Sequence, residues 1–365
     1  MNPIKILIVT KFFYPEITPR AFRAYELARE FSNQGHKVEV LTTKRDFNYS
    51  DLEEACGFKV KATVNNEPRE IQGQGFKRVL RYALLYLFQI PYSFLIFYFK
   101  KALLQEQSQY DMLISIAYPF PVHFGTALAL KKNKTLTKLW IADCGDPFVG
   151  SQHGRLPYPF YYKWIEKWFC KKVDYITVPI KEAIPAYPKK YQYKIKVIPQ
   201  GFNFSEIAPN YIPGKNKVPT FAYAGNLSPG LRDPRLLLDV LIALNIDFKF
   251  IVYTRNKGFL ESYKTELKDK LEFRDYVPRS VLLKELGQMD FLLNLENKGD
   301  TQQPSKLIDY ALLERPVLSI KPFNVDKNKV VEFLKGDYNN SLEVSNVEQY
   351  NIINVVAKFL EIFEE

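Results

Sequence analysis

Apolar residues recur along this chain with two alternating spacings, and the alternation predicts an α/β protein. Ile4–Thr10 is a short apolar run of strand length, and a helix is expected from about Arg20. One face of that helix collects apolar residues at i, i+3, i+4 and i+7: Ala24, Leu27, Ala28 and Phe31. His36–Thr42 then supplies a second strand, so the order strand–helix–strand predicts parallel strands joined by a right-handed crossover.

The same pattern continues in two successive sets of strands. Further strands of the first set are predicted at 112–116, 138–142, 175–178 and 196–198. A second set is predicted at 220–224, 248–254, 290–295 and 317–320. Two doubly wound sheets in one chain predict a ligand cleft that faces the carboxyl ends of both.

The domain boundaries are expected where Pro, Gly, Asn and Lys replace the periodic pattern. Residues 1–205 are predicted to form one Rossmann-like domain, 206–218 a linker and 219–345 a second domain. The stretch 346–365 is amphipathic and helical, and we expect it to pack back toward the first domain.

Composition narrows the class of protein. The chain has 365 residues, of which 47% are hydrophobic, and this describes a globular protein with full cores. Its three cysteines are too few for a disulfide framework or a zinc site, so a reducing, cytoplasmic compartment is expected. The strand-like run near residue 5 also argues against a signal peptide.

The net charge of +11 requires either an acidic partner or a solvated basic surface. No nucleic-acid-binding motif is present in the sequence, so we expect no nucleic-acid partner. A phosphate-bearing substrate and an anionic membrane surface remain as explanations.

The segment Tyr82–Phe99 contains no charged residue, while Lys77, Arg78 and Arg81 precede it. Three interpretations are open: a transmembrane helix at the lower limit of length, ordinary core or surface helices, and an interfacial patch on an anionic membrane. Pro91 within the run, and its place between strands of one sheet, argue against a span.

Two segments of the second domain have the chemistry of a phosphate site. Gly225 and Asn226 follow the first strand of this domain, and glycine there permits close approach of backbone to a ligand. Asp233 is expected to cap the next helix, which leaves Arg232 beside the helix start, where its guanidinium could hold a diphosphate. An arginine in a surface loop is the alternative.

The other segment follows the third strand of that domain. Pro304 suits a first helical turn, so the free amides of this turn, near Gln303, Ser305 and Lys306, are expected to attract phosphate. Asp309 lies one turn further, a position from which a carboxylate can hold ribose hydroxyls. An ordinary capped helix explains the same residues.

In the first domain, polar residues follow the predicted strand ends. Asp143 and Asp146 leave one strand, and acidic groups there could position an acceptor hydroxyl or take up its proton. His123 follows another strand and is a further catalytic candidate, and Arg23 is a candidate for substrate phosphate. A helix cap, a packed histidine and a surface arginine are the respective alternatives.

Five pieces, in order, resemble retaining glycosyltransferases of family 4, which have the GT-B fold of two facing Rossmann-like domains. They lie at 5–43, 143–148, 197–203, 304–310 and 315–317. The resemblance implies transfer of a hexose from a nucleoside diphosphate sugar to a hydroxyl, with retention and without a metal or further cofactor. It makes Arg232 a diphosphate ligand, Ser305 a phosphate ligand and Asp309 a ribose ligand.

The chain departs from the family pattern at two places. Thr301 stands where the first acidic residue of the donor motif is expected, and Gly145 replaces the arginine or histidine between the two acids.

The main hypothesis is an enzyme of cell-surface polysaccharide or glycolipid synthesis, with a saccharide or lipid-linked acceptor at the inner membrane face. Alternatives are a nucleotide-sugar 2-epimerase, a phosphorylase and a catalytically weak binding or assembly subunit. A nicotinamide oxidoreductase is disfavoured because no Gly-x-Gly-x-x-Gly follows the first strand.

Overall fold

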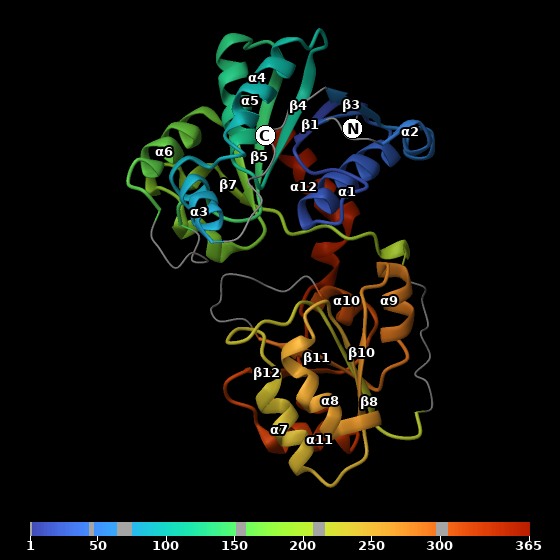
Figure 1. The fold of residues 1–365 in the computed structure, drawn as a ribbon. Helices are drawn as coiled ribbons and strands as arrows, with labels where there is room; N and C mark the ends of the chain where they lie inside the picture. Colours follow the sequence, from blue (N-terminus) through green and yellow to red (C-terminus); the bar gives the residue numbers. More distant parts are fainter. Residues whose placement is uncertain (1, 44–46, 64–74, 151–157, 207–215, 297–305) are drawn as a thin grey trace. The chain divides into compact units, whose positions relative to one another are not determined.

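The computed structural model describes residues 2–43, 47–63, 75–150, 158–206, 216–296 and 306–365 (Figure 1). The chain divides into two compact units. The first unit combines residues 1–202 with 351–365, and the second unit is Asn203–Tyr350. In the part of the chain so described, no helix has the length and hydropathy needed to span a membrane.

The first unit is built on a seven-stranded parallel sheet with the order β3-β2-β1-β4-β5-β6-β7. Its strands are β1 (Lys5–Thr10), β2 (Lys37–Thr43), β3 (Lys59–Thr63), β4 (Tyr110–Ala117), β5 (Thr137–Cys144), β6 (Tyr175–Val178) and β7 (Ile195–Val197). The order reverses between β1 and β4. In sheets of this type, ligands bind outside the carboxyl ends of the strands at such a reversal.

Helices cover both faces of this sheet. The helices of this unit are α1 (Pro19–Asn33), α2 (Ser50–Cys56), α3 (Phe76–Phe88), α4 (Phe94–Leu104), α5 (Pro121–Lys132), α6 (Tyr162–Lys172) and α12 (Ile352–Glu364). Alternate residues of β1 enter opposite cores: Ile6 and Ile8 pack on the side of α1 and α12, whereas Leu7 and Val9 pack on the side of α4, α5 and α6. The buried strands are therefore apolar on both faces, as parallel sheets require.

The second unit has a five-stranded parallel sheet with the order β10-β9-β8-β11-β12. Its strands are β8 (Thr220–Ala224), β9 (Lys249–Tyr253), β10 (Leu271–Arg274), β11 (Phe291–Leu295) and β12 (Val317–Ile320). Its helices are α7 (Arg235–Ala243), α8 (Glu261–Leu267), α9 (Arg279–Leu286), α10 (Lys306–Leu312) and α11 (Lys327–Leu334). The order reverses between β8 and β11, which places a candidate ligand edge there.

Helix α12 belongs to the first unit although it follows the whole second unit in sequence. Asn351 forms a parallel bridge with Phe202, and the Ile352 amide donates to the Phe202 carbonyl at 2.9 Å. Phe359 then packs on Phe31 of α1, with ring centroids 6.2 Å apart.

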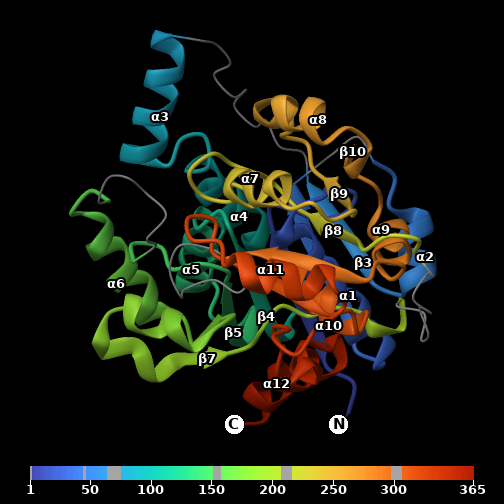
Figure 2. The ribbon, with the colours of Figure 1, turned by 90° about the horizontal axis from the view of Figure 1, so that it is seen from below.

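The uncharged segment 82–99 forms parts of two helices. Helix α4 is packed into the unit and buries Leu95 and Phe99, whereas α3 buries no residue. Figure 2 shows α3 standing apart from the sheet, on the side of the unit where α6 lies.

The predicted cap of α7 differs from the structure by one residue. Pro234, and not Asp233, is the residue before the helix, because the helix begins at Arg235. The Asp233 carboxylate still accepts from the Arg235 amide at 3.2 Å, so it satisfies one free donor of the first turn.

Candidate functional site

The carboxyl ends of β8 and β11 meet at the reversal of the second sheet, and the residues that follow them form the candidate donor site. The loop Gly225–Pro234 follows β8, and α10 is the helix after β11. The Ala224 amide donates to the Tyr310 hydroxyl at 3.2 Å, which ties the end of β8 to α10. Gln303 and Ser305, both predicted for this site, lie outside the described residues.

Lys306, the first residue of α10, has its ammonium group buried with no hydrogen-bond partner among the described residues. Its Nζ lies over the ring of Tyr223, 4.0 Å from the centroid. Burial, followed by the positive charge of Arg232, lowers the pKa of Lys306 well below its usual value. A cation held in this way is stabilised by any anion that reaches it.

Arg232 acts on this site from the β8–α7 loop. Its charge also lowers the pKa of Tyr223, although burial raises that pKa more strongly. Hydrogen bonds order the loop: the Ser228 amide donates to the Arg232 carbonyl at 3.1 Å, and the Gly225 amide to the Tyr253 carbonyl at 3.0 Å. Gly225, at φ +148°, adopts a conformation that a side chain would strain, while Asn226 is exposed.

Asp309, the predicted ribose ligand, is engaged within the second unit. Arg279 Nη2 donates to its Oδ1 at 2.6 Å and Arg279 Nε to the same atom at 3.2 Å. Burial raises the pKa of Asp309, and the arginine opposes that rise. The ribose role stays a prediction, and the ion pair gives this carboxylate a structural role of its own.

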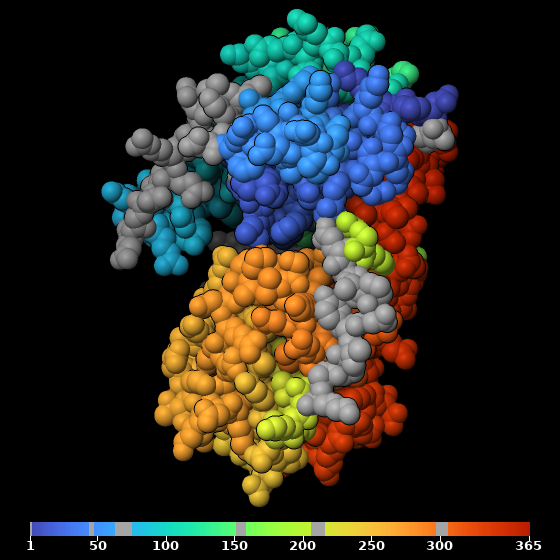
Figure 3. All heavy atoms as spheres, turned by 90° about the vertical axis from the view of Figure 1, so that its right-hand side faces the viewer, coloured from blue at the N-terminus to red at the C-terminus, as the bar shows by residue number. Residues whose placement is uncertain are grey.

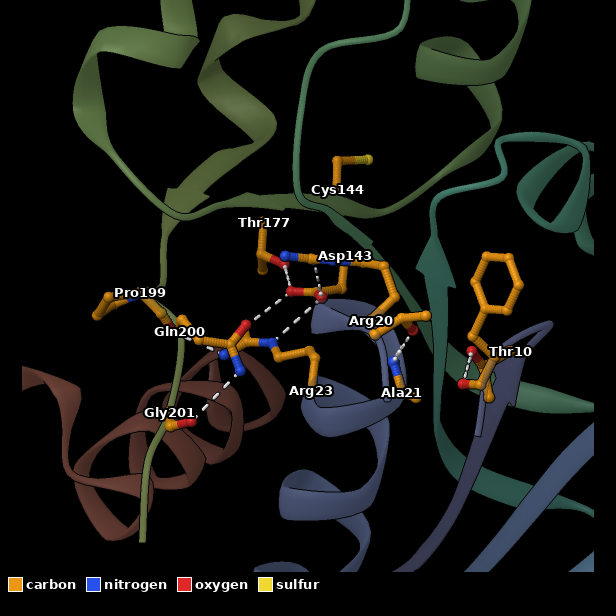
Figure 4. A network of polar contacts seen from close by, with 12 residues as sticks. Thr10, Arg20, Ala21, Arg23, Asp143, Cys144, Thr177, Pro199, Gln200 and Gly201 are labelled. Carbon is orange, nitrogen blue, oxygen red and sulfur yellow. Dashed lines mark hydrogen bonds and ion pairs between the residues drawn. The ribbon is translucent and has the colours of Figure 1, made fainter. Parts of the chain in front are cut away.

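Asp143, at the end of β5, is the centre of a buried polar network in the first unit (Figure 4). Arg23 of α1 binds both its oxygens, with Nη2–Oδ1 at 2.8 Å and Nε–Oδ2 at 3.2 Å, and Thr177 Oγ1 donates to Oδ1 at 2.7 Å. Burial would raise the pKa of Asp143, but Arg23, Arg20 and Thr177 outweigh it and lower the pKa. Asp143 therefore stays ionised and is a weak proton acceptor.

Arg23 was predicted to contact substrate phosphate, and its placement argues against that role. Its side chain is 2% exposed, and besides holding Asp143 it donates from Nη1 to the Pro199 carbonyl at 2.6 Å. A guanidinium with this many internal acceptors holds the strand end in place, and we interpret Arg23 as a positioning residue.

The sequence interpretation placed Arg20 at the start of the first helix without giving it a role, and its contacts make it a functional candidate. Its Nη1 lies 3.6 Å from Asp143 Oδ2, and its side chain is half-buried. A Cβ at Gly145 would come within 2.5 Å of the Arg20 Cζ, so the guanidinium occupies the space beside this glycine. A basic group thus lies next to the two acids although residue 145 supplies none, and Asp146, which is exposed, also interacts with Arg20.

His123 lies in the core of the first unit, with no exposed surface. Its Nδ1 is 2.8 Å from Ser115 Oγ, and its Nε2 is 3.5 Å from Cys144 Sγ. Burial lowers the pKa of His123 to about 3, so the ring is neutral at physiological pH. Its catalytic role stays a prediction, and this burial favours the alternative of a packed histidine.

Among the residues that the structure describes, no group of three or more His, Cys, Asp or Glu side chains could hold a metal ion.

Residues 21–206, half of the chain, match the model of a family described as Glycosyltransferase Family 4. The chain belongs to this family. Its two parallel sheets have the GT-B glycosyltransferase fold. No curated protein matches the sequence.

Solved structures similar to this glycosyltransferase share its fold over nearly their whole length. A glycosyltransferase from Rickettsia africae ESF-5 has a TM-score of 0.67 at 13% identity, covering 100% of this chain and 98% of its own. Anabaena HepE, solved with UDP and glucose, has a TM-score of 0.61 at 9% identity, covering 99% of both chains. A UDP-N-acetylglucosamine 2-epimerase from Rickettsia bellii has a TM-score of 0.53 at 13% identity, covering 100% of this chain and 96% of its own.

Proposed function

We propose that this family 4 glycosyltransferase moves a hexose from a nucleoside diphosphate sugar to a hydroxyl of a saccharide or lipid-linked acceptor, with retention and without a metal. We place the reaction in cell-surface polysaccharide or glycolipid synthesis, at the cytoplasmic face of the cell membrane. The observation that carries the donor half is the buried ammonium of Lys306, which has no hydrogen-bond partner among the described residues and is affected by the charge of Arg232.

A diphosphate suits these two cations for a physical reason. Burying a positive charge without a partner is costly, and a second positive charge nearby raises that cost. The anionic oxygens of a diphosphate would provide both cations with charge-assisted hydrogen bonds. The same contacts would stabilise the negative charge that develops on the leaving group, which is where catalysis gains most.

The remaining donor residues are assigned from their positions in the second unit. Gly225 allows the ligand to approach the backbone and the exposed Asn226 side chain can reach it. We assign Gln303 and Ser305 to the phosphates and Asp309 to the ribose, with Arg279 holding the carboxylate. HepE of Anabaena, which shares the fold, is described in complex with UDP-glucose, and this supports a nucleotide-sugar donor.

In the first unit, Asp146 is our candidate for contact with the acceptor hydroxyl, because its side chain is exposed. The buried Asp143 would act through Arg20, whose guanidinium it orients. The 2-epimerase alternative is less well supported, since we expect such an enzyme to use histidines in its cleft. Of the histidines that the structure describes, His36 is 7% exposed and His123 is 0% exposed.

The donor assignment is tested by nucleoside diphosphate binding and release. Wild-type protein is screened with UDP-, GDP- and dTDP-sugars, and release of nucleoside diphosphate is measured with and without chelator. Lys306→Met and Arg232→Ala should each weaken donor binding by about 10- to 100-fold, because each removes a charge-assisted contact of about 1.5–3 kcal/mol. Lys335→Met, at an exposed lysine of the same unit, is the matched control.

The outcomes separate the alternatives. Binding without release would identify a binding subunit, and interconversion of sugars without an acceptor would identify an epimerase. Retention is read from the anomeric proton coupling of the product by NMR. If both variants bind the donor as tightly as wild type, the diphosphate does not lie at Lys306 and Arg232.

A further inference from the structure

Helix α3 exposes its apolar side to solvent. Its apolar residues recur at the spacing of one helix face: Phe76, Val79, Leu80, Ala83 and Leu87. Phe76 is 79% exposed, Val79 65% and Leu80 39%, and no residue of the helix is buried. A surface helix normally turns such a face toward the core, but in the described part of the chain nothing buries this one.

The exposed charged residues of α3 and α6 all have one sign. Lys77, Arg78 and Arg81 are the charged residues of α3, and the helix contains no acid. The exposed charged residues of α6 are also basic, because its one acid, Glu166, is buried. They are Lys163, Lys167, Lys171 and Lys172.

Contacts join the two helices into one surface. The Tyr162 hydroxyl donates to the Tyr86 carbonyl of α3 at 3.0 Å, and the Tyr161 hydroxyl donates to the Leu87 carbonyl. Next to them, Phe160 is 69% exposed and Trp164 65% exposed, with ring centroids 5.4 Å apart. In Figure 3, the α3 atoms project from the rest of the first unit.

We propose that α3 and the start of α6 form a docking surface for an anionic lipid bilayer. The inference rests on the proposed function and deepens it, because such a surface would bring the enzyme to lipid-linked acceptors. The apolar face of α3 and the aromatic side chains at the start of α6 would enter the boundary between headgroups and acyl chains. The basic side chains would meet the anionic headgroups.

The charge distribution favours a bilayer over a second copy of this chain. Two copies meeting through this surface would bring five basic side chains of each against the other, namely Lys77, Arg78, Arg81, Lys163 and Lys167. An anionic bilayer meets the same five charges with opposite charge, and each basic residue near such a surface strengthens binding by about fivefold.

Co-flotation with vesicles tests the surface on the full-length protein. Neutral phosphatidylcholine vesicles are compared with vesicles containing 30% phosphatidylglycerol, at low and high salt. Wild type should float with the anionic vesicles at low salt only. Lys77→Gln/Arg78→Gln/Arg81→Gln should lower partition by about a hundredfold, since it removes three such charges, and Phe76→Ser/Leu80→Ser should also lower it.

The control variant Lys131→Gln/Lys132→Gln/Lys134→Gln removes three exposed lysines at the carboxyl end of α5 and should keep wild-type flotation. All variants alter exposed or half-buried side chains, and unchanged thermal melting verifies their folding. Absence of flotation, equal loss in the control, or α3 variants that change only the oligomeric state in size-exclusion chromatography would each overturn the proposal. Donor turnover without vesicles is measured in parallel, so that failure of the proposed function is seen separately.

Discussion

At the scale of single residues, Lys306 links ligand binding to proton binding. Burial lowers its pKa in the free protein, whereas a bound diphosphate would raise that pKa again. Nucleoside diphosphate binding should therefore take up a proton when the pH lies above the lowered pKa, and affinity should fall as pH rises through that range. Calorimetry of UDP binding in buffers of different ionisation enthalpy measures the uptake.

Lys306→Met should bind more weakly and lose this buffer dependence, while Lys335→Met should retain it. Equal proton uptake in wild type and Lys306→Met would show that another group titrates.

Glu166 predicts a pH dependence of stability. Its carboxyl is 4% exposed, accepts from the Val149 amide at 3.1 Å, and has a pKa that burial raises to about 7. Between the ordinary value of 4.5 and about 7, the folded state binds more protons than the unfolded state, so stability falls as pH rises through this window. The loss reaches about 3 kcal/mol, and it is complete above that range.

The melting transition of the first unit, followed by tryptophan fluorescence from pH 4.5 to 8.5, measures this loss. Glu166→Gln should flatten the decline and stabilise the protein at pH 8, whereas Glu54→Gln, at an exposed site of the same unit, should leave the wild-type profile. A decline that persists in Glu166→Gln would assign it to other groups.

Residue types alone indicated candidate chemistry, but burial could not be predicted from them. The strand ends pointed to Asp143 and His123, and both are buried. Their burial could not be predicted, because the residues that contact them lie up to 120 positions away in sequence. Arg20 was expected at the start of the first helix but received no role, because only the fold shows that α1 brings its guanidinium beside Gly145.

At the scale of elements, the central strands followed from sequence because they are buried on both faces and are uniformly apolar. The edge strands β3 and β10 were not predicted. β3 alternates lysine with small apolar residues and β10 carries two charges, and such patterns resemble exposed loops. The direction of the α3 apolar face was equally beyond the pattern, since periodicity shows that a face exists and not what covers it.

Helix α12 gives the element-scale prediction. Phe359 is 0% exposed, packs on Phe31, and lies 5.4 Å from the Arg23 guanidinium. Phe359→Ala should cost about 3–5 kcal/mol of stability through the cavity it leaves. Ile353→Ala, at a position of the same helix that is 54% exposed, should change stability by less than about 0.5 kcal/mol.

Urea unfolding followed by circular dichroism compares the two variants. Similar midpoints for both would show that α12 contributes little to the core of the first unit.

At the scale of the whole molecule, the order of motifs predicted the GT-B fold and the family, and the fold matches and family model confirm both. Each motif is short, but the motifs occur in one order that spans both sheets. This order is what identifies the fold and the family. The sugar, base and acceptor did not follow, because backbone groups and permissive loops make such contacts.

The bridge between Phe202 and Asn351 has a consequence for biosynthesis. The second unit, Asn203–Tyr350, is continuous in sequence and has all its strands before α12 is translated. The first unit, by contrast, keeps part of one side of its sheet uncovered, beside α1, until Val355, Val356 and Phe359 arrive. On the ribosome, the domain that begins the chain is therefore completed after the domain that interrupts it, and its exposed side must be kept from aggregation throughout that interval.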